Sequence, residues 1–290
     1  MVEAHLDKKK EDEFAVKRIP TGVSDFDTIV KGGLPAGSLV LLLGDVGAGQ
    51  QEYAYTSIAK IAIVSKYPHT RRYYLGSACD DGLLPRKMCY VSFTRSKEDI
   101  LNEVASSFNP QYVEAMRRMT LFKDFSGDYF KRTVVPPSWT HHEDEDLFVR
   151  RGGGLLEKLV SFLDENAQDA VVVIDSITDL VESDDVDIKD LIATVKGLHR
   201  ASKRWKGIVY LLLTQGIMER RYQQMLMDSV DGVLTFMWKN YFSSSKRQRY
   251  MYVEKFMSVL PHLDRERIAR FPTMVTSSQG LTIVYMERIA

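Results

Sequence analysis

One short segment constrains the fold of this 290-residue chain more than any other. It reads SLVLLLG over residues 38–44 and continues with the glycine-rich stretch DVGAGQQ to Gln51. An apolar run without alternation is typical of a strand that is covered on both faces, as in a parallel sheet flanked by helices. Apolar residues at helical spacing follow over 50–66. The segment therefore predicts a buried strand, a glycine loop and a helix in direct succession.

The alternation of strand and helix continues along the chain. Further strands are expected at 88–93, 120–125, 170–175 and 211–214, and helices after Ser96, at 155–166 and at 187–204. Such alternation predicts an α/β fold with a mostly parallel central sheet and helices on both faces. From Asp231 onward the pattern changes to segments of alternating polarity at 232–238, 249–256, 269–275 and 281–286. These predict a C-terminal antiparallel extension at one edge of the sheet.

The chain is expected to form a single domain over residues 19–290. Residues 1–18 begin with a mixed-charge run without apolar periodicity, which is typical of a mobile arm. Two stretches at about 67–87 and 127–150 interrupt the rhythm and predict surface insertions. The second contains the run HHEDED at 141–146, but neighbouring side chains on an extended chain point in opposite directions. A solvated acidic loop is therefore favoured there over a metal site.

Composition excludes several classes of protein. The chain has 39 basic and 39 acidic side chains, so it has no overall attraction to nucleic acid or to an anionic membrane. No run approaches the roughly 18–20 apolar residues of a membrane span, and the charged start lacks the apolar centre of a signal peptide. The two cysteines, Cys79 and Cys89, are expected to be free thiols. A cytoplasmic protein without membrane contact is the resulting expectation.

The glycine loop is the strongest candidate site. Gly44, Gly47 and Gly49 have the spacing that lets backbone N–H groups curl around a phosphate at the start of a helix. This kind of loop continues with a lysine for the phosphates and a serine or threonine for magnesium. Here both positions are glutamine, Gln50 and Gln51.

Three segments together resemble the KaiC- and RadA-like branch of the RecA-type ATPases. They are the lead-in TGVSDFDTIVKGGLPAGS at 21–38, the glycine loop, and VVVIDS at 171–176. The resemblance covers about residues 19–290 and implies a RecA-like three-layer fold. The positions that it implies for a degenerate nucleotide site are Gly44, Asp45, Val46, Gly47, Ala48, Gly49, Gln50, Gln51, Glu52, Asp175, Gln215 and Lys255.

The resemblance also implies roles for the later positions. Asp175 matches the family aspartate that holds the water shell of magnesium, so any metal contact here is expected to be indirect. Gln215 matches a sensing polar residue at the end of a strand. Lys255 matches the first member of a Lys-x-Arg pair that reaches the phosphates of a neighbouring subunit, but Met257 stands in place of the arginine.

The departures from the family pattern fall on the residues that perform the chemistry. Thr94 and Arg95 stand where the family has acidic residues that activate water. Loss of the loop lysine removes a contact of roughly 1.5–3 kcal/mol, and Glu52 competes with a phosphate for the positive helix end. Phosphoryl transfer relies on the lysine, magnesium and an oriented water together. We therefore predict a pseudo-ATPase without catalytic residues and without a required cofactor, which binds ATP and magnesium weakly or not at all.

By analogy with the family, such a protein would act as a regulatory or assembly module, with itself or with an active paralogue. Two alternatives stay open. One is a weak ATPase in which Arg95, Lys255 or a neighbour's arginine replaces the loop lysine. The other is a recombinase paralogue that binds single-stranded DNA, because basic clusters at 71–72, 220–221 and 246–249 lie near tyrosines. The first predicts magnesium-dependent turnover, and the second predicts DNA binding that weakens steeply with salt.

Overall fold

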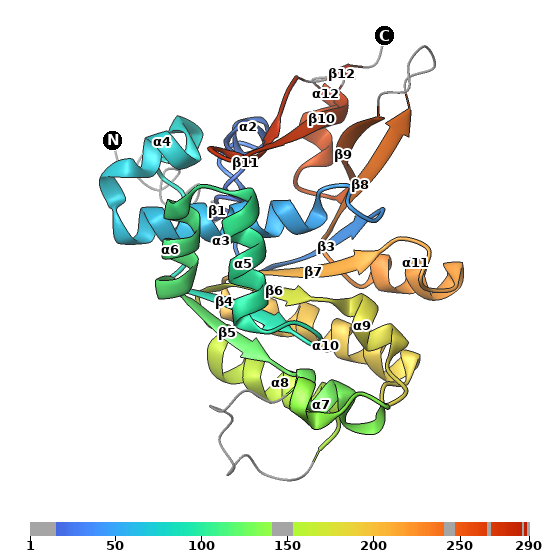
Figure 1. The fold of residues 1–290 in the computed structure, drawn as a ribbon. Coiled ribbons are helices and arrows are strands. Elements are labelled where there is room, and N and C mark those ends of the chain that lie inside the picture. Colours follow the sequence, from blue (N-terminus) through green and yellow to red (C-terminus); the bar gives the residue numbers. More distant parts are fainter. Residues whose placement is uncertain (1–15, 141–152, 241–246, 266–267, 286, 289–290) are drawn as a thin grey trace, which may run out of the picture.

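A ten-stranded mixed sheet organises the chain, in the order β11-β10-β9-β8-β3-β7-β6-β4-β5 with β12 beside β10 (Figure 1). The computed structural model describes residues 16–140, 153–240, 247–265, 268–285 and 287–288. Most of the predicted N-terminal arm and the run 141–146 lie outside these residues.

The strands are β1 (Arg18–Ile19), β2 (Leu34–Pro35), β3 (Ser38–Gly44), β4 (Lys87–Ser92), β5 (Thr120–Asp124), β6 (Ala170–Asp175), β7 (Ile208–Thr214), β8 (Gly232–Asn240), β9 (Arg247–Phe256), β10 (Ile268–Thr276), β11 (Gly280–Ile283) and β12 (Glu287–Arg288). The α-helices are α2 (Ser24–Ile29), α3 (Gln50–Lys66), α4 (Arg71–Leu75), α5 (Lys97–Ser107), α6 (Pro110–Met119), α7 (Ser126–Tyr129), α8 (Leu155–Asn166), α9 (Ile177–Glu182), α10 (Ile188–Trp205), α11 (Arg220–Asp228) and α12 (Leu260–Arg265). Short 3₁₀ helices are η1 (Pro68–Thr70), η2 (Ser77–Cys79), η3 (Phe130–Arg132) and η4 (Pro137–Trp139).

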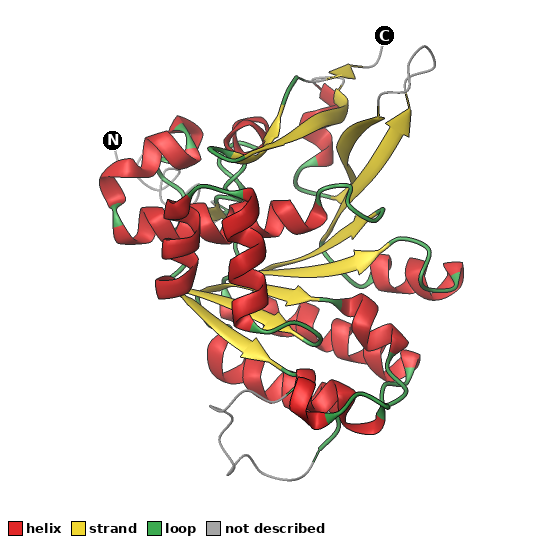
Figure 2. Cartoon of the chain, viewed as in Figure 1, coloured by secondary structure: helices red, strands yellow, loops and turns green. Residues whose placement is uncertain are grey.

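The predicted parallel core is confirmed. Strand β3 runs parallel to both β7 and β8, and β6 runs parallel to β4 and β7. All seven residues of β3 are buried, which is why its sequence is an unbroken apolar run. Alternate side chains of β3 enter two separate hydrophobic clusters, one formed with α3, α5 and α6 and the other with α8, α9 and α10. Figure 2 shows helices on both sides of the sheet. The result is the three-layer α/β arrangement expected from the sequence.

The C-terminal extension is antiparallel as predicted, and its first strand, β8, also joins the parallel part of the sheet. β9, β10 and β11 pair antiparallel with their neighbours, whereas β8 runs parallel to β3 on one side and antiparallel to β9 on the other. β8 follows the helical crossover α11, which returns the chain in the parallel direction. The alternating pattern of residues 232–238 contains no information about that direction.

Two smaller expectations also meet the structure. Helix α5 begins with the predicted capping box of Ser96 and Asp99, and Cys79 and Cys89 are buried free thiols. The interruption at 67–87 folds into the short helices η1, α4 and η2, with Tyr74 and Leu75 buried. No helix in the described part of the chain is both long and apolar enough to cross a membrane.

Candidate functional site

The glycine loop lies at the carboxyl end of β3 and leads into α3. It turns at Gly47 (φ 72°) and Gly49 (φ 125°), a backbone conformation that glycine adopts without strain. The side chain of Gln50 folds back against the loop and lies next to Gly44. A Cβ added to Gly44 would lie only 2.4 Å from Gln50 Oε1, so this close approach requires glycine. Gln50 Nε2 donates a hydrogen bond to the carbonyl oxygen of Asp45 at 3.2 Å. The inner wall of the loop is therefore covered by the loop's own glutamine.

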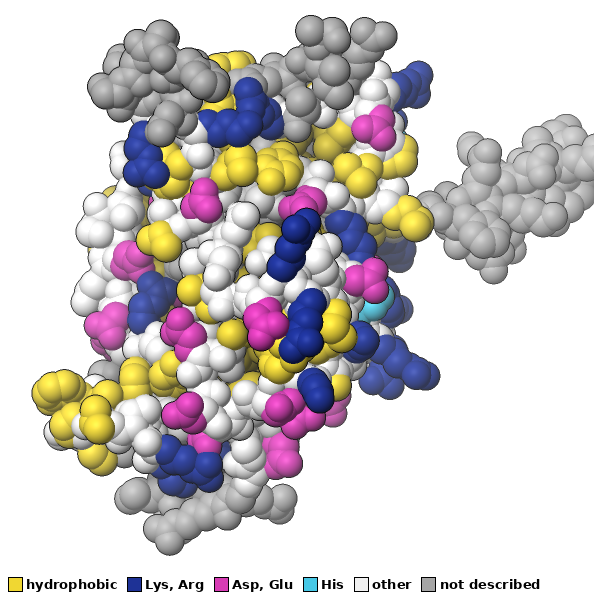
Figure 3. All heavy atoms as spheres, turned by 90° about the vertical axis from the view of Figure 1, so that its right-hand side faces the viewer, with side chains coloured by type: hydrophobic (Ala, Val, Ile, Leu, Met, Phe, Trp, Pro, Cys, Tyr) yellow, Lys and Arg dark blue, Asp and Glu magenta, His cyan; other side chains and the backbone are white. Residues whose placement is uncertain are grey.

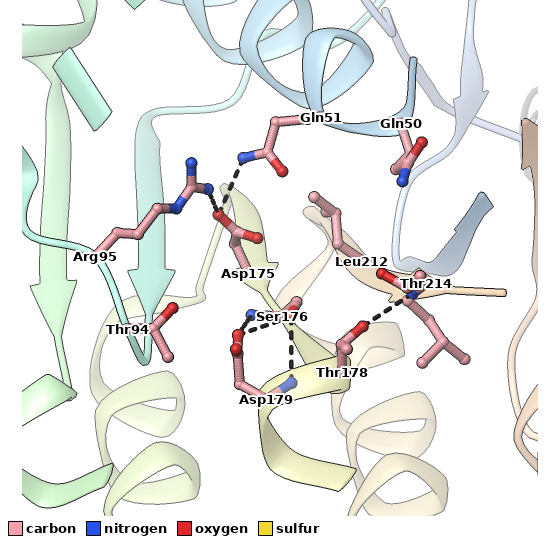
Figure 4. A pocket seen from close by; sticks show the side chains of 11 residues that line it. Gln50, Gln51, Thr94, Arg95, Asp175, Ser176, Thr178, Asp179, Leu212 and Thr214 are labelled. Atoms are coloured by element: carbon pink, nitrogen blue, oxygen red, sulfur yellow. Dashed lines mark hydrogen bonds and ion pairs between the residues drawn. The ribbon is translucent and has the colours of Figure 1, made fainter. Parts of the chain in front are cut away.

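Asp175 is the centre of a second set of contacts, at the end of β6 (Figure 4). Its side chain is only 8% exposed. Asp175 Oδ2 accepts hydrogen bonds from Tyr90 Oη at 2.6 Å and from Gln51 Nε2 at 3.0 Å, and it forms an ion pair with Arg95. The donors come from β4, from α3 and from the turn after β4, so Asp175 joins three parts of the fold.

Arg95 is held by more than Asp175. Its guanidinium also pairs with Glu103 of α5 and donates to Tyr55 Oη at 3.2 Å. Burial alone would lower the pKa of Arg95, but the negative charges around it, above all Asp175, raise that pKa. Burial and the charge of Asp175 likewise raise the pKa of Tyr90, so its hydroxyl stays protonated and donates. Arg95 is therefore a permanent cation placed against Asp175 by its own chain.

A pocket of about 270 Å³ lies between the loop and the ends of β6 and β7 (Figure 4). Its lining residues are Gln50, Gln51, Thr94, Arg95, Asp175, Ser176, Thr178, Asp179, Leu212, Leu213 and Thr214. Asp179 caps α9 through Ser176, and burial raises the pKa of its carboxyl group. Arg95 is the one cation in this lining and faces two carboxylates, with Glu103 behind it. This balance of charge disfavours a polyphosphate.

The structure brings some of the predicted site residues together and separates others. Gln50, Gln51 and Asp175 line one pocket. Gln215 contributes a backbone N–H to the carbonyl of Gly44 but does not line the pocket. Lys255 Nζ donates to three carbonyl oxygens at the end of α11, on Met227, Asp228 and Val230, at 2.7–3.0 Å.

Of the remaining loop residues, Val46 and Gly47 are exposed, whereas Ala48 and Gly49 are buried. Val46 is 81% exposed, and its carbonyl accepts a hydrogen bond from Trp238 Nε1 at 3.1 Å. Arg249 Nε donates to the carbonyl of Gly47 at 3.1 Å, and its guanidinium lies 3.5 Å from Glu52. Strands β8 and β9 thus support the loop from outside, a contact that the sequence did not predict.

Sequence reasoning also missed Tyr90, Tyr55 and Glu103. The buried strand MCYVSF contains a tyrosine whose hydroxyl requires a hydrogen-bond partner when it is buried. That signal points to a polar neighbour for Tyr90 without identifying Asp175.

The residues present do not fit a magnesium-bound nucleotide. Where magnesium needs an oxygen ligand, Gln51 directs its N–H to Asp175, and Arg95 already provides a positive charge at that carboxylate.

No protein-family model matches this sequence, and no curated protein matches it either. Solved structures do match. The KaiC-like protein PH0186 from the hyperthermophilic archaeon Pyrococcus horikoshii OT3 superposes with a TM-score of 0.61 at 17% identity, over 93% of this chain and 100% of that one. The flagellar accessory protein FlaH from Methanocaldococcus jannaschii gives 0.58 at 15% identity, over 95% and 100%. The fold is RecA-like. At these identities the likeness concerns the fold alone.

Proposed function

We propose that this chain is a RecA-like module that does not hydrolyse ATP and that acts in regulation or assembly. One observation carries the proposal: the chain's own side chains occupy the contacts that a nucleotide and magnesium would need. Gln50 covers the inside of the loop, and Gln51 and Arg95 bind Asp175. ATP binding is weak or absent in this arrangement.

The cost of admitting a nucleotide supports the same view. A triphosphate would enter a pocket in which carboxylates outnumber cations, and it would have to displace Gln50 from the loop. If magnesium accompanied it to Asp175, the Arg95 ion pair would have to break. Breaking a buried ion pair typically costs about 3–5 kcal/mol, which is comparable to the binding energy of a weak ligand.

The alternative of a weak ATPase needs a substitute for the missing lysine. Arg95 is engaged by Asp175 and Glu103. The three N–H groups of Lys255 have three carbonyl acceptors in its own chain. Neither cation is free to take the place of the lysine, so the contacts favour the inactive module.

The proposed partners are a second copy of the chain or an active RecA-like relative. The neighbour FlaH is described as an accessory protein, which is the kind of role proposed here. An assembly that does not depend on nucleotide should have the same mass with and without ATP and magnesium. Light scattering of the purified protein in both conditions tests this.

Calorimetric titration of ATP with and without magnesium, followed by phosphate release, tests the lack of activity. We expect no magnesium-dependent binding and no turnover. The triple variant Gln50→Lys, Gln51→Ser and Arg95→Ser restores the lysine and the hydroxyl and frees Asp175, so it should gain magnesium-dependent ATP binding. Turnover by the unmodified protein that disappears in Asp175→Asn would falsify the proposal.

A further inference from the structure

Strands β8 and β9 continue past the body of the sheet as a two-stranded arm, defined here as residues 237–240 and 247–249 (Figure 1). Strand β3 ends at Gly44, opposite Phe236 of β8. On the other side, β9 pairs with β10 from Arg249 onward. The arm is therefore held to the molecule mainly at its base, beside the glycine loop.

The base of the arm holds two guanidinium groups in place. Arg247 and Arg249 lie over the ring of Trp238, at 4.7 and 4.8 Å from its centroid. The ring itself is fixed, since Trp238 Nε1 donates to the carbonyl of Val46. Cation–π contact with a fixed ring reduces the freedom of both arginines before any ligand arrives.

The pairing register places cations on both faces of the arm. Trp238 pairs with Arg249, so Arg247 and Arg249 share one face. Lys239 pairs with Gln248 and belongs to the opposite face. That opposite face continues to Tyr250, and Arg270 of β10 lies 4.7 Å from the centre of the Tyr250 ring.

Much of this charge is not compensated within the described chain. No described carboxylate lies within ion-pair distance of Lys239 or Arg247, and both residues are exposed. In the basic cluster on α11, Arg221 pairs with Glu219 at 3.1 Å and covers Tyr222, while Arg220 is exposed. In Figure 3, a group of Lys and Arg side chains lies near the top of the visible face, and a second group lies lower down at its right-hand edge. On a neutral chain, such a local excess marks a surface for an anionic partner.

We propose that the arm binds a nucleic-acid duplex by entering a groove and contacting the phosphates on both sides. A two-stranded ribbon fits the major groove of DNA, which is about 12 Å wide. Cations on both faces of the ribbon then meet the two flanking backbones, and arginine forks bind phosphate oxygens with two parallel hydrogen bonds. Since Trp238 is covered by Arg247 and Arg249, stacking on unpaired bases is disfavoured. The proposal does not depend on the state of the nucleotide pocket.

Fluorescence anisotropy with a labelled DNA duplex two helical turns long tests this at several salt concentrations. The decisive variant is Lys239→Gln with Arg247→Gln. Its matched control is Lys196→Gln with Arg200→Gln, which removes the same charge from exposed positions on α10. Thermal unfolding of both variants establishes that they are folded. The same oligonucleotide as a single strand, polyglutamate, and vesicles of anionic phospholipid serve as competing ligands.

We expect the unmodified protein to bind the duplex with an affinity that falls steeply with salt. The arm variant should bind roughly tenfold more weakly, and the slope of log affinity against log salt should fall by about 2, because two phosphate contacts are lost. The control variant should retain both values. Absence of duplex binding at low salt, an equal loss in the control, or tighter binding of the single strand, the polyglutamate or the vesicles would each overturn the proposal.

Discussion

The pocket beside Asp175 and the arm both lie next to the glycine loop, and they differ in how their charged side chains are paired. In the pocket, Arg95 is surrounded by Asp175, Glu103 and two tyrosine hydroxyls. On the arm, Lys239 and Arg247 are exposed, and no described carboxylate pairs with them. The pocket has become part of the internal structure, whereas the charge of the arm is available to a partner.

The two regions therefore contribute differently to stability and to association. Charges that are buried and mutually bonded stabilise a particular fold, and removing one partner leaves the other unsatisfied. Exposed charges contribute little to stability but govern association. Substitutions of single cations should therefore separate the two regions by their effect on unfolding.

The largest loss of stability is expected for Arg95→Met. The change leaves Asp175 buried with two neutral donors and no cation, and it should lower the free energy of unfolding by about 3 kcal/mol. Chemical denaturation measures this value. Arg72→Met is the matched control, since it removes an Arg–Asp pair that is 78% and 33% exposed and should change the free energy of unfolding far less. Equal effects of the two substitutions would mean that the pocket network adds no stability.

Lys60→Met tests how a buried cation without an ion pair among the described residues affects the free energy of unfolding. The Lys60 side chain is 1% exposed, and none of the hydrogen bonds among the described residues involves it. Burial lowers its pKa from 10.5 to about 8, against the opposing charges of Asp27 and Asp25. The folded protein therefore carries an unfavourable ammonium below pH 8. We expect the substitution to raise the free energy of unfolding on the order of 2 kcal/mol at pH 7.

The pH dependence of that gain is a separate check. Because the folded-state pKa is below the unfolded value, the cost of Lys60 is full below pH 8 and disappears as the pH rises from 8 to 10.5. The stabilisation by Lys60→Met should shrink over the same interval. A gain that stays constant through this range would show that side-chain packing, and not the desolvated charge, is responsible.

Much of the fold follows from the sequence because its strands are covered on both faces. The predicted ranges 38–44 and 170–175 coincide with β3 and β6, where burial requires an unbroken apolar run. Residues 232–238 form the predicted antiparallel hairpin, as β8 with β9. That β8 also pairs parallel with β3 was not predicted, since alternating polarity reports which face is buried and not whether a neighbour is parallel. Direction depends on the crossover that precedes the strand.

The candidate site could be predicted only in part, for a similar reason. Gln50, Gln51 and Asp175 lie together because the parallel strands β3, β7 and β6 end at one edge of the sheet. The sequence also identified Arg95 as a residue that differs from the acidic residue in the family pattern. Its partners Asp175 and Glu103 are 80 and 8 residues away, and such pairings are decided by packing between elements rather than by local pattern.

Lys255→Met is expected to have an intermediate effect. The ammonium of Lys255 has three carbonyl acceptors around the carboxyl end of α11, where a cation also complements the helix dipole. Its loss leaves carbonyl groups that water can partly satisfy, so the free energy of unfolding should fall by about 1–2 kcal/mol. Hydrogen exchange should show faster opening of α11 in this variant. Protection of α11 equal to that of the unmodified protein would contradict a capping role for Lys255.

The smallest effect on stability is expected for Lys239→Met with Arg247→Met. Both side chains are exposed, and no described carboxylate pairs with them, so the free energy of unfolding should change by less than about 0.5 kcal/mol. Denaturation of the variant and of the unmodified protein at low and high salt provides the measurement. The change from low to high salt should shift the unfolding midpoint of both proteins by the same amount. A loss above about 1 kcal/mol at low salt would mean that the chain compensates these charges internally. The arm would then resemble the pocket, and its charge would no longer indicate a partner.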